Sequence, residues 1–161
     1  AGLYGTTLGY THAGLFYTIS AVSMIIIRMI SKHFMDTVPA IKTMTGAVAC
    51  GILCCLMLLA APYGEPVFLA SGIFYGLATG ISLPLNQSVA VKNTPPERWG
   101  AANALFLLAN DIGIGFASGI WGVINDSFGF QTSIVCVIVC LIASYASAWI
   151  VYPARDKRWR H

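Results

Sequence analysis

The sequence predicts an all-α integral membrane protein, and three observations support this prediction. Hydrophobic residues make up 57% of the 161-residue chain and charged residues only 9%, whereas a soluble domain usually carries about 25% charged residues. Apolar runs recur along the chain, and each is long enough to cross a hydrocarbon core, which takes about 20 helical residues. The basic residues gather between alternate runs. The main solvent of this protein is therefore expected to be lipid.

Five apolar runs are predicted to be full transmembrane helices. None has the short apolar segment and small-residue cleavage site of a removable signal peptide. The chain begins with Ala1 rather than methionine, so we expect it to be part of a longer protein. The predicted spans are residues 13–30, 43–61, 67–91, 101–124 and 132–152.

The basic residues predict the orientation of these spans, because Lys and Arg are retained in short loops on the cytoplasmic side of a membrane. The start (residues 1–12) and the connections 61–66 and 125–131 contain no basic residue. We therefore expect a multi-pass protein of the cell membrane, with its start outside and its C-terminus in the cytoplasm. Topology and attraction to anionic lipid explain the basic tail, so no nucleic-acid partner is predicted. The nine basic residues are Arg28, Lys32, Lys42, Lys92, Arg98, Arg155, Lys157, Arg158 and Arg160.

Two spans, 43–61 and 132–152, contain little that is more polar than Ser, Thr, Cys, Trp and Tyr, so they are expected to be supports that face lipid. All cysteines lie in these spans, where a thiol behaves as a small apolar group. Neither span supplies a His or carboxylate ligand, so no metal site is predicted. The cysteines are Cys50, Cys54, Cys55, Cys136 and Cys140.

The span 67–91 combines small and polar residues on one side. At 100° per residue, its glycines, a threonine and two amides share a face. Small residues permit a close neighbouring helix, and buried amides need a partner or water. The residues of this face are Gly72, Gly76, Thr79, Asn86 and Gln87, with Pro84 near the cytoplasmic end.

The span 101–124 carries a carboxylate, Asp111, in its middle. At 1.5 Å per residue, Asp111 lies about 15 Å from the cytoplasmic end of the span, near the bilayer centre. Asn103 and Asn110 form an adjacent stripe. Five small residues fall within about 40° of Asp111 on the helix, namely Gly100, Ala104, Gly115, Ser118 and Gly122.

Two roles for Asp111 follow from its depth. An intramembrane carboxylate is costly unless it is protonated, paired or facing a watery cavity, so it is a candidate for handling substrate or protons. The alternative is a protonated Asp that hydrogen-bonds a neighbouring helix and locks the packing. We therefore place Asp111, Asn110, Asn103 and Asn86 in a candidate proton-coupling or substrate-binding site.

The connection "RMISKHFMDTVPAIK", residues 28–42, has an Arg at the end of the first span and an Asp eight residues later. Alone, it indicates a solvated turn. With the repeated spans, the "PPERWGAANALF" segment and the Gly-rich face that follows it, the chain resembles the C-terminal half of a major facilitator superfamily transporter. That family has an Arg-x-x-x-Gly-x-x-x-Asp-Arg-x-Gly-like pattern in this cytoplasmic loop. Arg28 and Asp36 match the pattern, and three positions depart from it: Lys32, Thr37 and Pro39.

The resemblance implies a major-facilitator-type six-helix bundle, of which the chain supplies five full helices. The spans correspond to helices eight to twelve of twelve, residues 1–10 to the outer end of helix seven, and residues 153–161 to a cytoplasmic tail. The family places helices nine and twelve outside as supports, which agrees with the polarity of the spans. It also implies a gating role for the loop with Arg28 and Asp36.

The implied function is part of a secondary active transporter that moves a small molecule across the membrane by alternating access. The stretch "ERWGAANALFLLANDIGIG" is similar to the junction of helices ten and eleven in proton-coupled exporters, which favours proton-coupled export. The implied partners are a small-molecule substrate, a proton, the lipid bilayer and the N-terminal half of the transporter. An uptake symporter of the same superfamily and a non-transporting assembly subunit remain alternatives.

An enzyme is not predicted. His12, His33 and His161 are the only histidines, and all lie at span ends or beyond, so no His, Cys and carboxylate cluster shares one membrane depth. The glycine-rich stretch "GIGFASGIWG" lies within an apolar helix, without a preceding strand or a Lys, so it is not a nucleotide-binding loop. No cofactor is expected.

Overall fold

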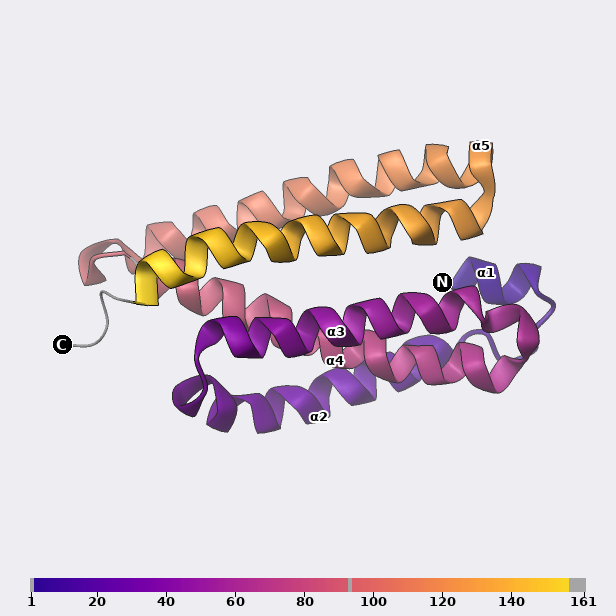
Figure 1. Ribbon diagram of the computed structural model, residues 1–161, viewed down its shortest axis with the longest axis horizontal. Coiled ribbons are helices and arrows are strands. Elements are labelled where there is room, and N and C mark those ends of the chain that lie inside the picture. Colours follow the sequence, from indigo (N-terminus) through magenta and orange to yellow (C-terminus); the bar gives the residue numbers. More distant parts are fainter. Residues whose placement is uncertain (1, 93, 157–161) are drawn as a thin grey trace.

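A computed structural model describes residues 2–92 and 94–156, without the side chains of residues 2–3, 32–37 and 150–156. The regular structure of this part of the chain is entirely helical, which confirms the predicted all-α class. Figure 1 shows elongated helices packed side by side. In chain order they are α1 (Gly2–Thr7), α2 (Leu15–Thr37), α3 (Ala40–Leu59), the 3-10 helix η1 (Ala61–Tyr63), α4 (Glu65–Lys92), the 3-10 helix η2 (Pro96–Arg98) and α5 (Trp99–Asp156).

The connection predicted at residues 28–42 is mostly helix, so that prediction was wrong in its extent. Helix α2 continues to Thr37, and α3 begins at Ala40. Nothing between Arg28 and Thr37 breaks a helix, because this stretch contains neither Gly nor Pro. Pro39 then ends it, since proline disfavours helical geometry in the residue before it. Arg28 and Asp36 therefore lie on one helix rather than in a loop.

The connection predicted at residues 125–131 is also shorter than expected. Helix α5 is continuous except at Gly129, where φ is 81° and ψ is 167°. A positive φ of this size favours glycine, which has no Cβ to clash with the backbone. Figure 1 shows the chain doubling back there. We call residues 99–128 the N-terminal arm of α5 and residues 130–156 the C-terminal arm.

Three helices of the described chain are long and apolar enough to cross a membrane: α3, α4 and the Pro96–Trp149 stretch, which contains η2 and most of α5. The last of these has 54 residues, more than twice the length that one crossing needs, so each of its arms has enough residues for a crossing. The apolar part of α2, Leu15–Ser31, is slightly shorter. Many large apolar side chains face outward, as in Phe116, which is 72% exposed. Such a surface suits lipid rather than water.

Helix α4 lies between α2 and α3 and packs closely against both, whereas α2 and α3 hardly touch each other. Glycines four residues apart make the contact with α2 close. A Cβ built on Gly76 would lie 2.7 Å from Ser23 Cβ and 3.0 Å from the Met24 backbone nitrogen, and would also meet the Ser20 carbonyl. Interfaces of this small-xxx-small kind let two helix backbones approach each other in a membrane. Gly72 and Gly80, four residues to either side of Gly76, also contact α2.

The C-terminal arm of α5 packs on α3. The Thr45 and Tyr145 hydroxyls are hydrogen-bonded at 2.8 Å, and Leu141 lies against Gly51. In Figure 1, α5 lies on one side of α3 and α2 on the other. The N-terminal arm is different, because none of its residues is fully buried. The core of the described chain therefore excludes the arm that carries Asp111.

Candidate functional site

The N-terminal arm of α5 turns one stripe toward the rest of the bundle. Asn103, Asn110, Ala117 and Trp121 are half-buried, and they lie within about 40° of one another on the helix. Asp111 is exposed, about 100° around the helix from Asn110. The structure therefore places Asp111 beside the packed stripe rather than within it.

The small-residue face around Asp111 has no neighbour among the described residues. Cβ atoms built on Gly100, Gly115 and Gly122 would meet nothing within 4 Å. A packing role for Asp111 against another helix of this chain therefore has no support in the described structure. The face is open around Asp111, whereas Gly122 at its end lines the cavity among α3, α4 and α5.

The predicted amides separate into different places. Gln87 Nε2 donates a hydrogen bond to Asn103 Oδ1, which joins α4 to the N-terminal arm of α5. Near the same end of the bundle, the Trp99 indole donates to the Thr94 carbonyl at 2.9 Å. Gln87 was not in the predicted site, although its position in an apolar span marked it as an amide that needs a partner. Its hydrogen bond to Asn103 holds the start of the N-terminal arm against α4.

A cavity of about 690 Å³ lies among α3, α4 and the two arms of α5. Asn86 is the one member of the predicted site that lines it, because Asn103, Asn110 and Asp111 are not in its wall. Asn125 was missed, since the sequence placed it in an external connection. The wall has hydroxyl and amide groups but no Asp, Glu, Lys, Arg or His. Its polar side chains are Tyr75, Thr79, Ser82, Asn86, Trp121, Asn125, Ser133 and Ser144.

The predicted gate residues both belong to helix α2. The Arg28 side chain is exposed, while the Asp36 side chain lies outside the described residues. Eight residues of helix separate the two by about 12 Å along the axis. Helix geometry therefore rules out a close Arg28–Asp36 pair.

The described residues contain no group of three or more His, Cys, Asp or Glu side chains placed to hold a metal ion. The cysteines are free thiols. Cys54 and Cys55 are buried among the apolar side chains of α3 and its neighbours, where a thiol packs as a small apolar residue.

Comparison with known proteins assigns the chain to a protein family. The family model of the Major Facilitator Superfamily matches residues 3–161. The chain belongs to the major facilitator superfamily. The resemblance inferred from the sequence is thus confirmed, and so is a multi-pass membrane protein of a transporter family.

A relative of this major facilitator chain is the staphylopine export protein of Staphylococcus aureus. The two are 26% identical over 159 aligned residues, which cover 94% of this chain. The chain spans only 40% of the length of that relative. No solved structure matches the chain significantly.

Proposed function

We propose that this chain is the C-terminal half of a secondary transporter that exports a small molecule across the cell membrane in exchange for protons. The observation that carries the proposal is the family match over residues 3–161. The relative that is named as an export protein favours export over uptake. An uptake symporter is the second candidate, because the superfamily resemblance alone fits either direction.

In this proposal the open face of the N-terminal arm turns toward the other half of the transporter. Asp111 is exposed on that face, and the glycines around it have free space. A membrane-embedded carboxylate is costly to keep charged and isolated, so it suits a group that exchanges a proton or pairs with a cation. Rocking of the two halves around a midplane site would expose Asp111 to each side in turn.

A non-transporting assembly subunit explains Asp111 less well. A structural role predicts that the carboxylate is paired or hydrogen-bonded within the packed bundle, because an unpaired polar group in a membrane is costly. The Asp111 side chain is instead exposed, on an arm without a fully buried residue. This arrangement favours a site completed by groups outside the chain.

The proposal is tested in inside-out membrane vesicles that contain the full-length transporter. When the lumen is acidified, adding substrate should release lumenal protons, and staphylopine is the first compound to try because of the relative's name. A tag fused after His161 should be accessible on these vesicles, since the nine basic residues predict a cytoplasmic C-terminus.

Vesicles with the 161-residue chain alone are the control and should release no protons, because alternating access needs a second half to close against. Proton release by this chain alone would contradict the half-transporter proposal. A tag reachable only from the lumen would contradict the orientation.

We further propose that Asp36 helps to hold the cytoplasmic gate. Its partner is expected to be a basic residue other than Arg28, because Arg28 lies about 12 Å away along α2. Asp36→Asn in the full-length transporter should lower the transport rate severalfold and leave membrane abundance unchanged. Transport assays at matched protein amounts check this expectation, with Asp126→Asn as the control. An unchanged rate would reduce this acidic position to part of a solvated helix end.

A further inference from the structure

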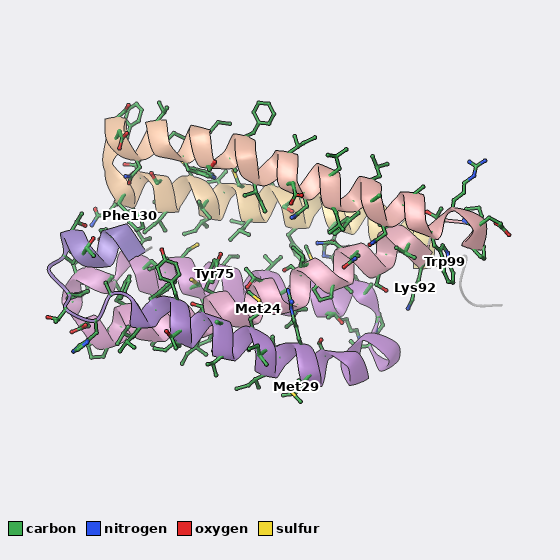
Figure 2. All side chains as sticks on the ribbon, turned by 180° about the vertical axis from the view of Figure 1, so that it is seen from behind. Met24, Met29, Tyr75, Lys92, Trp99 and Phe130 are labelled. Atoms are coloured by element: carbon green, nitrogen blue, oxygen red, sulfur yellow. The ribbon has the colours of Figure 1, made fainter. Side chains whose placement is uncertain are left out.

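The start of the N-terminal arm of α5 is held by hydrogen bonds at two points. Gln87 Nε2, in the last turns of α4, donates to Asn103 Oδ1. One helical turn before Asn103, the Trp99 indole donates to the Thr94 carbonyl at 2.9 Å. Trp99 and Asn103 are about 40° apart around the helix, so the same side of the arm makes both contacts. Figure 2 shows Trp99 at the same end of the molecule as Lys92, the last residue of α4.

The rest of the N-terminal arm is loosely packed within the described chain. None of its residues is fully buried, and α5 contacts α3 far more than α4. Cβ atoms built on Gly113 and Gly115 would meet nothing within 4 Å. Burial of apolar surface is the main force that favours one packing of a helix over another, and the arm has little of it. The two polar contacts at its start are therefore what holds the arm at one rotation about its own axis.

The Gln87–Asn103 pair lies in the predicted membrane region of both helices. Both side chains are half-buried. An amide that loses its partner in a membrane is costly, because no water replaces the lost hydrogen bond. Hydrogen bonds between amides of neighbouring helices stabilise their association for this reason. Breaking this bond leaves an amide on each helix without the partner it has here.

The rotation of the arm decides which way Asp111 faces. Asp111 follows Asn103 by eight residues, which places it about 80° around the helix and about 12 Å along it. An α-helix is stiff over two turns, so Asp111 turns with Asn103. With the bond to Gln87 formed, Asp111 is exposed on the open face. A rotation in one direction would carry it onto the packed stripe, and in the other direction away from it.

We propose that Gln87 is a positioning residue for Asp111: by holding Asn103, it fixes the rotation of the N-terminal arm so that the carboxylate faces the other half of the transporter. This inference rests on the proposed function, in which Asp111 acts at that face. It gives Asn103 the task of orienting Asp111 in place of the predicted contact with substrate or protons. The competing account is a pair that stabilises the chain without setting the rotation.

The labelling of two engineered cysteines measures this rotation. Gly115→Cys and Gly113→Cys are made separately in the full-length transporter, with its native cysteines replaced by alanine. Gly115 lies about 40° around the helix from Asp111, whereas Gly113 lies about 160° away on the other side. A membrane-impermeant methanethiosulfonate reacts with the thiolate, which forms in water rather than in lipid. Gly115→Cys should therefore react severalfold faster than Gly113→Cys.

Loss of the amide pair should bring the two labelling rates severalfold closer together. Gln87→Met keeps the length of the side chain without its amide, and Asn103→Leu keeps the shape of the other partner. Each should change the ratio, and the two together should change it no further, because the bond is already lost. The exchanged pair, Gln87→Asn with Asn103→Gln, keeps both amides and their combined length and should restore the ratio.

Gln131→Met is the matched control and should leave the ratio of labelling rates unchanged. Gln131 is the only other glutamine of the sequence, and it is exposed on the C-terminal arm. An unchanged ratio in Gln87→Met and Asn103→Leu would overturn the proposal. Additive effects of these two changes, or an exchanged pair that does not restore the ratio, would also overturn it in favour of simple packing.

The labelling ratio separates positioning from stability and from transport. It is measured on the protein that reaches the membrane, so a purely stabilising pair predicts lower abundance of the variants with the original ratio. Labelling needs no transport. A protein that labels as expected without transporting contradicts the proposed function alone, whereas one that transports with the same ratio in every variant contradicts the positioning role alone.

Discussion

Replacing Gly76 by alanine should destabilise the folded chain, although alanine favours helices. An added Cβ would meet the backbone of α2 at Ser20 and Met24, and a backbone cannot rotate out of the way as a side chain can. Overpacking of this kind costs typically about 1–3 kcal/mol, and we expect the upper end. A cost of about 3 kcal/mol shifts the folding equilibrium more than 100-fold. Unfolding in detergent by increasing SDS measures it.

A glycine-to-alanine control in α3 is expected not to lower the stability of the chain. Gly46 lies within α3, where an added Cβ meets nothing within 4 Å, so Gly46→Ala should be neutral or gain up to about 1 kcal/mol from helix propensity. Gly80→Ala should also be destabilising, because the added Cβ would meet the stiff β-branched side chain of Ile27 and lie close to the Met24 backbone. Equal stability of Gly76→Ala and Gly46→Ala would show that the α2–α4 contact is looser than described.

Replacing Asp111 by asparagine should abolish proton-driven accumulation by the full-length transporter while leaving substrate exchange intact. Asparagine keeps the shape and hydrogen bonding of the side chain but cannot exchange a proton. Transport driven by a pH gradient should then fall to simple equilibration, whereas counterflow between equal pH values should continue. Uptake into inside-out vesicles, with and without an imposed gradient, measures the two.

Asp126→Asn is the matched control, because Asp126 is an exposed carboxylate on the same arm, near the Gly129 turn. It should transport normally. Loss of cationic substrates only, in Asp111→Asn, would indicate that Asp111 pairs with the substrate instead of the coupling proton. If Asp111→Asn accumulates every substrate with the original pH dependence, neither role holds and Asp111 serves packing or solubility.

The sequence predicted the helical class because that class follows from composition and run length, which need no tertiary information. It misjudged where helices end. The polar stretch after Arg28 is typical of a loop that follows a transmembrane helix. A helix can nevertheless continue beyond the hydrocarbon core of the membrane. Pro39 ends it instead. Likewise Gly129 alone makes the turn in α5, and charge patterning gave no sign that its neighbours stay helical.

The residues of the candidate site do not come together in the structure, because they face different neighbours once α4 and α5 pack. Asn103 bonds Gln87, Asn86 lines the cavity, and Asp111 lies on an open face. Helical periodicity gives the angle between two residues of one helix, but not which angle faces a neighbour. Which side of α5 faces a neighbouring helix depends on the direction of α5 relative to α4, and no local sequence pattern predicts that direction. The role of Asp111 stays a prediction.

The α2–α4 contact also sets an order of events during synthesis. Its partners, such as Ser20 and Gly76, all lie before Lys92, so α2, α3 and α4 can assemble while α5 is still unmade. At about 5–20 residues per second, the 58 residues of α5 take roughly 3–12 s to translate. A unit of α2, α3 and α4, closely packed through the α4 glycines, would thus form in the bilayer before α5 is complete. The C-terminal arm of α5 would then pack on α3 of this unit. Ribosome stalling within α5, once α4 has left the ribosome, should therefore trap a folded three-helix unit, whereas stalling before Glu65 should not.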